Sequence, residues 1–208
     1  MRVTVFGATG AIGQKVVAEA LSAGHTVRAF TRDAARLPAD AGITPVVGDL
    51  ADPARIRAAI EGSEAVIWAV GATANTPDQP PLFEAAARSA VDAMRALGVR
   101  RLVALSGAGI TLAGERKPLS GRLMTAIVGV LARHVVEAKR REYEIFSRSG
   151  LDWTIVRPPR VAPGPAGRTF HAGSHLQGRT VSDGTLARFM VLQLTDPTYI
   201  GGAPYISV

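Results

Sequence analysis

The chain has 208 residues, a formal net charge of +7 and no cysteine. This length suits one α/β domain with a substantial core. The absence of cysteine excludes disulfides and thiolate chemistry and fits an intracellular protein. The positive charge would suit nucleic acid, but the arginines are scattered, aromatic residues make up only 5%, and no stacking motif appears. We therefore expect no nucleic-acid partner, and a basic surface that attracts an anionic cofactor.

No apolar run approaches the ~20 residues that a membrane-spanning helix needs. The start, Met1-Arg2-Val3, leads directly into a strand pattern and leaves no room for a signal peptide. We expect a cytoplasmic protein with no membrane partner. We also expect a monomer or small homo-oligomer that takes a small-molecule substrate.

The first predicted unit is a strand, Arg2–Phe6, followed by three glycines at a spacing of three and by a helix that ends at Gly24. Gly7 lets the chain turn off the strand, Gly10 lets the backbone approach a pyrophosphate, and Gly13 lets the helix pack on the sheet. The helix N-terminus offers unpaired N–H groups to phosphates. This pattern predicts a dinucleotide-binding turn, although its spacing differs from the commonest fingerprint.

Strands and helices then alternate along the chain. Further strands are expected at Thr26–Thr31, Thr44–Val47, Ala65–Val70, Arg101–Ser106, Asp152–Val156 and about Pro204–Val208. Helices are expected from Asp52-Pro53 to about Gly62, at about Pro81–Leu97, within Ser120–Ser149 with a break near Gly129, and at about Asp183–Leu194. Two segments, Gly107–Pro118 and Arg157–Arg179, are expected to hold little regular structure.

One stretch inside the third of these helical regions is strongly apolar. It contains Leu123, Met124, Ile127, Val128, Val130 and Leu131. It can be a buried helix, a lid over the substrate or an oligomer contact.

Alternating strands and helices predict an α/β fold with a doubly wound parallel sheet of Rossmann type. We expect a single domain over residues 1–208, with substrate-side loops from its C-terminal part. In such sheets the ligand lies across the carboxyl ends of the strands. One cleft should therefore collect the glycine turn and the residues that follow each strand.

The residues after the second strand bear on the choice between NAD and NADP. An NAD site carries an acidic residue there, whereas this strand is followed by Arg32, with Arg36 one turn on. A guanidinium pairs with a 2′-phosphate and stacks on adenine. Asp33 is the counter-argument, because it can be the ribose acid or only cap a turn. The sequence favours NADPH over NADH.

Several motifs together resemble those of the atypical short-chain dehydrogenase/reductase (SDR) proteins with an NAD(P)H-binding domain. They are Gly7–Gly13, Thr31-Arg32-Asp33, Gly48-Asp49-Leu50, Leu105-Ser106, Ser149-Gly150-Leu151-Asp152-Trp153-Thr154 and Arg157-Pro158-Pro159. The nearest likeness is to the biliverdin reductase B/flavin reductase group, and NmrA-like redox sensors are more distant. The resemblance covers nearly the whole chain and implies a Rossmann-type fold, NADPH binding and hydride transfer to flavins or similar planar acceptors.

The resemblance also implies which residues contact the cofactor. Thr9 and Ile12 would lend backbone N–H groups to the pyrophosphate beside Gly7, Gly10 and Gly13. The 2′-phosphate would meet Arg32 and Arg36, the adenine would lie between Asp49 and Leu50, the nicotinamide ribose would meet Val70, Gly71 and Ala72, and the nicotinamide would pack near Pro158 and Pro159. For Asp49 the alternative is a cap of the following loop.

The catalytic residues of conventional SDR enzymes are only partly present. These enzymes use a Ser with a Tyr-x-x-x-Lys pair, but Val135 stands four residues before Lys139. Ser106 is a candidate to bond the nicotinamide carboxamide or a substrate carbonyl, or only local backbone. Lys139 is a candidate to touch the nicotinamide ribose, or only a solvated helix charge. Arg160 stands where the reductase group has His, and an arginine there suits an anionic substrate.

The missing tyrosine still permits a reductase. A flavin, quinone or related conjugated carbonyl needs no strong protein acid, so placement of cofactor against acceptor is enough. The main alternative is a non-catalytic NADP(H)-binding sensor of NmrA-like type, and a third is an isomerase or ketoreductase with an unusual acid. No metal is expected, because no carboxylate accompanies His171 and His175.

Overall fold

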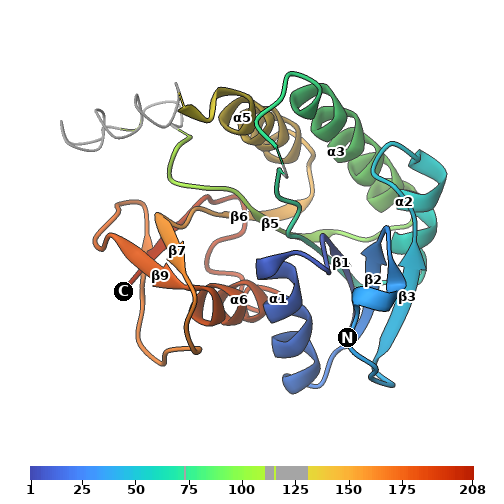
Figure 1. Cartoon of the computed structure of the whole chain (residues 1–208), viewed down its shortest axis with the longest axis horizontal. Coiled ribbons are helices and arrows are strands. Elements are labelled where there is room, and N and C mark those ends of the chain that lie inside the picture. The colour runs from blue at the N-terminus through green and yellow to red at the C-terminus, as the bar shows by residue number, and fades with distance from the viewer. Residues whose placement is uncertain (73, 111–114, 116–130) are drawn as a thin grey trace.

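The computed structural model describes residues 1–72, 74–110, 115 and 131–208. The centre of this described part is a six-stranded sheet with the order β3-β2-β1-β4-β5-β6 (Figure 1). All of its neighbouring strands run parallel. The strands are β1 (Arg2–Phe6), β2 (Thr26–Thr31), β3 (Ile43–Val47), β4 (Ala65–Trp68), β5 (Arg101–Leu105) and β6 (Asp152–Val156).

Helices cover both faces of the sheet (Figure 1). One face carries α1 (Ala11–Ser22) and α6 (Asp183–Leu192), and the other carries α2 (Pro53–Ile60), α3 (Gln79–Ala96) and α5 (Arg133–Ser147). Side chains alternate between the two layers along β1, since Val3 and Val5 pack on the α1 side and Phe6 packs on the α3 side. The predicted Rossmann-type α/β fold is confirmed.

Local signals in the sequence account for most boundaries of these elements. The Asp52 side chain accepts hydrogen bonds from the N–H groups of Ala54 and Arg55, and Pro53 follows as the first helical residue of α2. Gly24 has φ +79° just after α1, which is the left-handed conformation that a helix end favours. α3 begins at Gln79, two residues before the predicted start, because its first turn accommodates Pro80 and Pro81.

The prediction that Arg157–Arg179 holds little regular structure is wrong in part. This segment contains β7 (Arg160–Ala162) and β8 (His171–Gly173). β7 pairs in parallel with β9 (Thr180–Ser182), and β8 pairs antiparallel with β10 (Tyr205–Ser207). Strands of three residues show no recognisable alternation, and their partners are distant in the chain, so the sequence pattern hides them.

Smaller differences concern individual elements. β4 ends at Trp68 rather than at Val70, and a short 3₁₀ helix, η1 (Ala34–Arg36), follows β2. The helix expected within Ser120–Ser149 is seen as α5, and its part before residue 131 lies outside the described residues, as do the apolar residues 123–130. Leu131, the last of that stretch, is 73% exposed.

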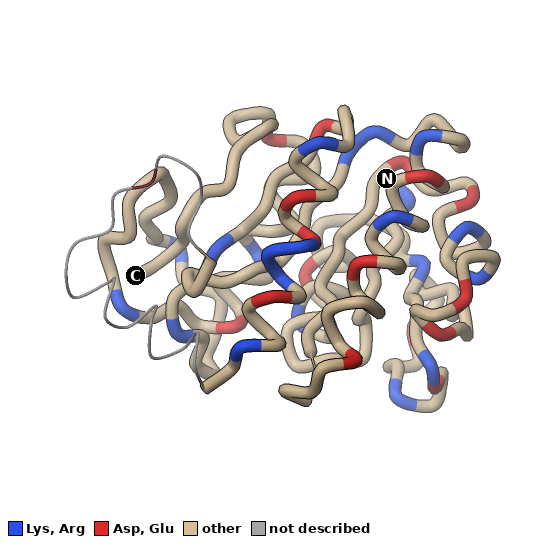
Figure 2. The backbone as a smooth tube through the Cα atoms, turned by 90° about the horizontal axis from the view of Figure 1, so that it is seen from above, with Lys and Arg blue, Asp and Glu red and all other residues tan. Residues whose placement is uncertain are grey.

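Two general properties bear on function. Lys and Arg positions are interspersed with Asp and Glu positions along much of the described chain (Figure 2). Within the described residues, no helix combines the length and the apolar character needed to cross a membrane. The strand order reverses direction between β1 and β4, and the carboxyl ends of these strands form the switch point where ligands bind in such sheets.

Candidate functional site

A cavity of about 460 Å³ lies at this switch point. Its walls come from the turn after β1, the ends of β2 and β4, the β3–α2 loop and the first turns of α3. The lining residues include the predicted cofactor contacts Gly7, Thr9, Gly10, Ile12, Arg32, Arg36, Asp49, Leu50, Val70, Gly71 and Ala72. The structure thus brings eleven of the predicted residues into one space.

The glycine turn is shaped by close backbone approaches. Gly7 has φ +76°, and a Cβ on it would lie 2.6 Å from the Ala69 oxygen. A Cβ on Gly13 would lie 1.9 Å from the Gly7 oxygen, so only glycine allows α1 to sit this close. The first helical hydrogen bond runs from Gln14 N–H to the Gly10 oxygen. The preceding N–H groups of α1 therefore have no helical acceptor and suit an anion.

Two exposed arginines stand at one end of the cavity. The Arg36 Nη2 atom donates to the Thr9 oxygen at 3.3 Å, which holds this guanidinium beside the glycine turn. Arg32 lines the cavity and is exposed. Asp33 does not line it, and its Oδ1 atom accepts from Ala35 N–H at 3.0 Å at the start of η1. The reading of Asp33 as a turn cap is therefore confirmed.

Asp49 and Leu50 form the wall opposite the glycine turn. The Asp49 Oδ1 atom accepts from Ala51 N–H at 2.9 Å, so this carboxylate does cap the following loop. Asp49 is nevertheless exposed and lines the cavity. The two roles are compatible, because a carboxylate has a second oxygen.

The other end of the cavity contains residues that the sequence did not single out. These are three residues from the start of α3, namely Gln79, Leu82 and Phe83, and beside them lies Leu105 of the Leu105-Ser106 motif, for which no cofactor contact was predicted. The available signal was topological, because the helix that follows a parallel strand begins near the strand's carboxyl end. Its single-residue contacts could not be read from the periodicity alone.

Ser106 lies next to the cavity rather than in its described lining. Its N–H donates to the Val156 oxygen at 2.9 Å, and Ala108 N–H donates to the Pro158 oxygen at 2.9 Å, so the ends of β5 and β6 lie side by side. The Ser106 Oγ atom is buried and has no hydrogen-bond partner among the described residues. Its alternative role as a local turn bond is therefore not seen.

Pro158 is buried, Pro159 is partly buried and Arg160 is exposed at the start of β7. These three do not line the cavity.

The Lys139 side chain contacts the backbone just after β4 and at the end of β5. Its Nζ atom donates to the Val70 oxygen at 2.6 Å, to the Leu105 oxygen at 3.2 Å and to the Glu142 Oε2 atom at 2.7 Å. The side chain is 11% exposed, so its reading as a solvated helix charge is wrong. Burial raises the pKa of Glu142, and the Lys139 charge opposes that rise.

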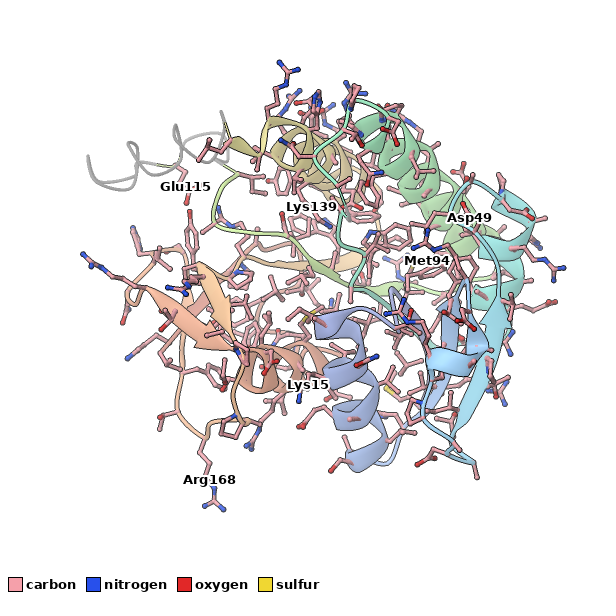
Figure 3. The ribbon with its side chains drawn as sticks, viewed as in Figure 1. Lys15, Asp49, Met94, Glu115, Lys139 and Arg168 are labelled. Carbon is pink, nitrogen blue, oxygen red and sulfur yellow. The ribbon has the colours of Figure 1, made fainter. Side chains whose placement is uncertain are left out.

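A second buried cluster follows β6. The Arg157 side chain is 3% exposed, and its Nη1 atom lies 2.9 Å from the Glu115 Oε2 atom. Its guanidinium carbon lies 3.9 Å from the centre of the Tyr205 ring, and the Tyr205 hydroxyl donates to Glu115. Burial and this carboxylate raise the pKa of Tyr205. Figure 3 places Glu115 beside β7 and β9 and away from Asp49. No pattern in the sequence predicts this long-range cluster.

Another cavity, of about 430 Å³, lies between α3 and α5. Several of its charged lining residues are paired with one another. Arg141 bonds Glu84 and Glu137, and Arg140 bonds Glu137 and Glu144. We therefore place the functional site in the first cavity.

The NAD(P)H-binding family model matches residues 7–197. This chain belongs to the NAD(P)H-binding family. A solved short-chain dehydrogenase/reductase from Veillonella parvula, in complex with NADP, has the same fold with a TM-score of 0.82. The two are 21% identical, and the match covers 100% of this chain and 94% of the other. The expected membership of an NAD(P)H-binding family is confirmed by the family model, and the expected Rossmann-type fold by the solved structure.

Within this family the curated relatives carry different activities in their names. A 3-diazoavenalumate denitrifying reductase from a Streptomyces species is 39% identical over 118 residues, which cover 51% of this chain and 38% of that protein. An uncharacterized sugar epimerase, YhfK from Bacillus subtilis, is 29% identical over 203 residues, which cover 94% and 89%. This chain thus spans well under half of the reductase and most of the protein named as an epimerase.

Proposed function

We propose that this protein is an NADPH-dependent reductase whose acceptor is a flavin, a quinone or a related conjugated carbonyl. One observation carries the proposal. A single cavity joins two exposed arginines, Arg32 and Arg36, to the glycine turn and to the strand ends at Val70 and Leu105. Bound NADPH supplies the hydride, and the protein supplies binding, orientation and electrostatics.

The residues of the cavity suit the parts of this cofactor in order. The free N–H groups at the start of α1 suit the pyrophosphate, and Gly7 and Gly10 of the glycine turn line the cavity beside them. Arg32 and Arg36 suit a 2′-phosphate, which NADPH has and NADH lacks. The second carboxylate oxygen of Asp49 suits the adenine amine. These assignments favour NADPH over NADH.

At the other end, Val70, Gly71 and Ala72 would border the nicotinamide ribose, with Pro158 and Pro159 near the ring. The buried Ser106 Oγ atom has no hydrogen-bond partner in the described part of the chain, and its hydroxyl suits the nicotinamide carboxamide or an acceptor carbonyl. Arg160 is exposed and would attract an anionic acceptor. The C-terminal part of the single domain would thereby supply the substrate side.

The tyrosines of the chain favour an acceptor that needs no strong protein acid. There are three, and all of them are described. The Tyr199 hydroxyl donates to the Ala172 oxygen, the Tyr205 hydroxyl donates to Glu115, and the Tyr143 ring packs edge-on against Trp153. None of them lines the cavity. Reduction of a flavin or quinone, with the proton taken from water, fits this arrangement better than alcohol oxidation does.

The same observation favours one second candidate, a non-catalytic NADP(H) sensor. In that case the cavity would bind the cofactor, and its redox state would change the contact with a protein partner. Turnover distinguishes the two candidates, because a sensor binds NADPH without consuming it.

The test is NADPH consumption by the purified protein, followed by absorbance with FMN, riboflavin, biliverdin and small quinones in turn. The reductase predicts acceptor-dependent turnover that Arg32→Ala weakens. Arg168→Ala is the matched control, because this exposed arginine points away from the body of the protein (Figure 3). Tight NADPH binding with no turnover on any acceptor would instead favour the sensor.

A further inference from the structure

A buried ion pair lies behind the proposed nicotinamide end of the cavity. Lys139 and Glu142 both belong to α5, and their side chains are 11% and 3% exposed. The Lys139 ammonium has three protons and three acceptors: Glu142, the Val70 oxygen and the Leu105 oxygen. The other oxygen of the Glu142 carboxylate accepts from the Trp68 Nε1 atom at 2.8 Å. Each ammonium proton of Lys139 can therefore meet an acceptor, and each carboxylate oxygen of Glu142 accepts one hydrogen bond within the protein.

The Val70 and Leu105 carbonyls lie just beyond the last paired residues of β4 and β5. The pairing of β4 with β5 ends at Trp68 and Ala104. Val70 lies two residues beyond that last pair, and Leu105 lies one residue beyond it. The Lys139 ammonium bridges these two carbonyls and so continues the contact between the strands past the last backbone pair.

Three groups next to this ammonium are walls of the cavity. Val70 and Leu105 line it, and so does Phe83, whose ring centre lies 5.8 Å from the Lys139 Nζ atom. Moving the ammonium would release two strand ends and one aromatic wall at the same time. At the proposed adenine end, Arg36 bonds the Thr9 oxygen and Asp49 accepts from Ala51 N–H, and neither bond involves this pair.

We propose that Lys139 is a positioning residue that sets the nicotinamide wall by holding Val70 and Leu105, and that Glu142 and Trp68 hold Lys139 in place. This inference rests on the proposed function, since it assumes that the cavity takes NADPH. It replaces a direct contact between Lys139 and the ribose with an action through the protein backbone. It also gives Glu142 and Trp68 a role that no motif indicates.

The test separates the two ends of the cavity by using two ligands. NADPH fills both ends, whereas adenosine 2′,5′-bisphosphate carries only the adenine and 2′-phosphate groups. Dissociation constants for both are measured by calorimetry with the full chain and with Lys139→Met and Glu142→Gln. Arg140→Met is the matched control, because it removes a cation of α5 that is paired at the surface with Glu137 and Glu144.

We expect Lys139→Met and Glu142→Gln each to weaken NADPH binding about tenfold, as the loss of a charged hydrogen bond would. Binding of the bisphosphate should stay unchanged in both, and Arg140→Met should change neither ligand. In Glu142→Gln the Lys139 ammonium keeps its charge but faces an amide. If Lys139 contacts the ribose directly, this variant should bind NADPH as tightly as the unaltered protein. That result would overturn the proposal.

Equal weakening of both ligands would also overturn it, because it would indicate a general loss of structure. The double variant Lys139→Met/Glu142→Gln removes both charges of this pair. It therefore controls for misfolding caused by one unpaired charge. It should bind the bisphosphate normally and NADPH weakly. If the unaltered protein binds neither ligand, the proposed function itself fails, and this inference fails with it.

Discussion

The two ends of the cavity are built in opposite ways. The proposed adenine end presents exposed charges, Arg32, Arg36 and Asp49, on short loops after the strands. The proposed nicotinamide end has neutral residues such as Val70 and Leu105 in its lining, with a buried ion pair behind them. The first end can recognise a charged group directly, whereas the lining of the second contributes mainly its shape.

This difference separates recognition from positioning. An exposed guanidinium contributes when a phosphate arrives, and it costs the folded protein little when none is present. A buried pair such as Lys139–Glu142 is costly to break, because a single charge left in the interior is poorly solvated. Substitutions at the adenine end should therefore act on ligand affinity, and those behind the nicotinamide end should act on stability as well.

The largest effect should follow from breaking the buried pair. Lys139→Met leaves the Glu142 carboxylate without its cation, so we expect the free energy of unfolding to fall by about 3–5 kcal/mol at pH 7. Burial already raises the pKa of Glu142 from 4.5. A carboxyl group whose pKa is higher in the folded than in the unfolded protein contributes its full stabilisation below the unfolded pKa. This contribution is lost as pH rises. The deficit should therefore grow from pH 4.5 upward.

Urea unfolding at several pH values measures this prediction. The double variant Lys139→Met/Glu142→Gln should recover part of the loss, since it leaves no buried charge. A loss in Lys139→Met no larger than that in the surface variant Arg140→Met would contradict the contrast between the two ends.

A smaller effect on stability is expected where the two ends meet, at the glycine turn. Gly13→Ala places a Cβ 1.9 Å from the Gly7 oxygen. α1 must then move away from the turn, at about 1–3 kcal/mol, and NADPH binding should be lost because the turn faces the pyrophosphate. Gly173→Ala is the control, because a Cβ there meets nothing within 4 Å and its φ is not positive. Thermal unfolding and calorimetry check both, and equal behaviour of the two variants would refute the assignment.

At the adenine end alone the effect should be confined to affinity. Arg32→Ala should weaken NADPH binding about tenfold, as expected for one charged hydrogen bond. NADH binding and the free energy of unfolding should not change, since Arg32 is exposed and NADH has no 2′-phosphate. Titration with the two cofactors measures the ratio of their dissociation constants. A parallel loss for both cofactors would remove Arg32 from the 2′-phosphate site.

The contrast also explains which parts of the molecule could be predicted. The glycine turn, the cap at Asp52 and the strand ends each show as a pattern of neighbouring residues. The sheet and the proposed adenine end could therefore be predicted from short stretches of sequence. Arg157, Glu115 and Tyr205 come together from three distant segments, and β7 to β10 have only three residues each. No periodicity encodes such contacts, because they depend on how the finished sheet arranges its loops.

Lys139 illustrates the same limit at the site. The motif comparison placed it near the nicotinamide, but its chemistry depends on Glu142 three residues later and on Trp68 in β4. A glutamate on a helix surface normally predicts a solvated charge. Its burial becomes visible only in the structure, where α5 packs against the sheet. Direct contact of Lys139 with the ribose stays a prediction, and the two-ligand test separates it from the positioning role.

The smallest effect should come from the partly exposed ion pairs of Glu137. The stability cost of breaking them is the reference for the cost of breaking the buried Lys139–Glu142 pair. Bonds from Arg140, and then from Arg141, lower the pKa of Glu137 from 4.5 to about 2. A lowered carboxyl pKa stabilises the fold above pH 4.5, and this contribution is lost as pH falls toward 2. Since Glu137 is partly exposed, Glu137→Gln should cost only about 0.5–1 kcal/mol at pH 7. Urea unfolding should show that the free energies of unfolding of Glu137→Gln and the unaltered protein converge near pH 2 and in high salt. A loss of stability as large as that in Lys139→Met would mean that burial does not distinguish these pairs.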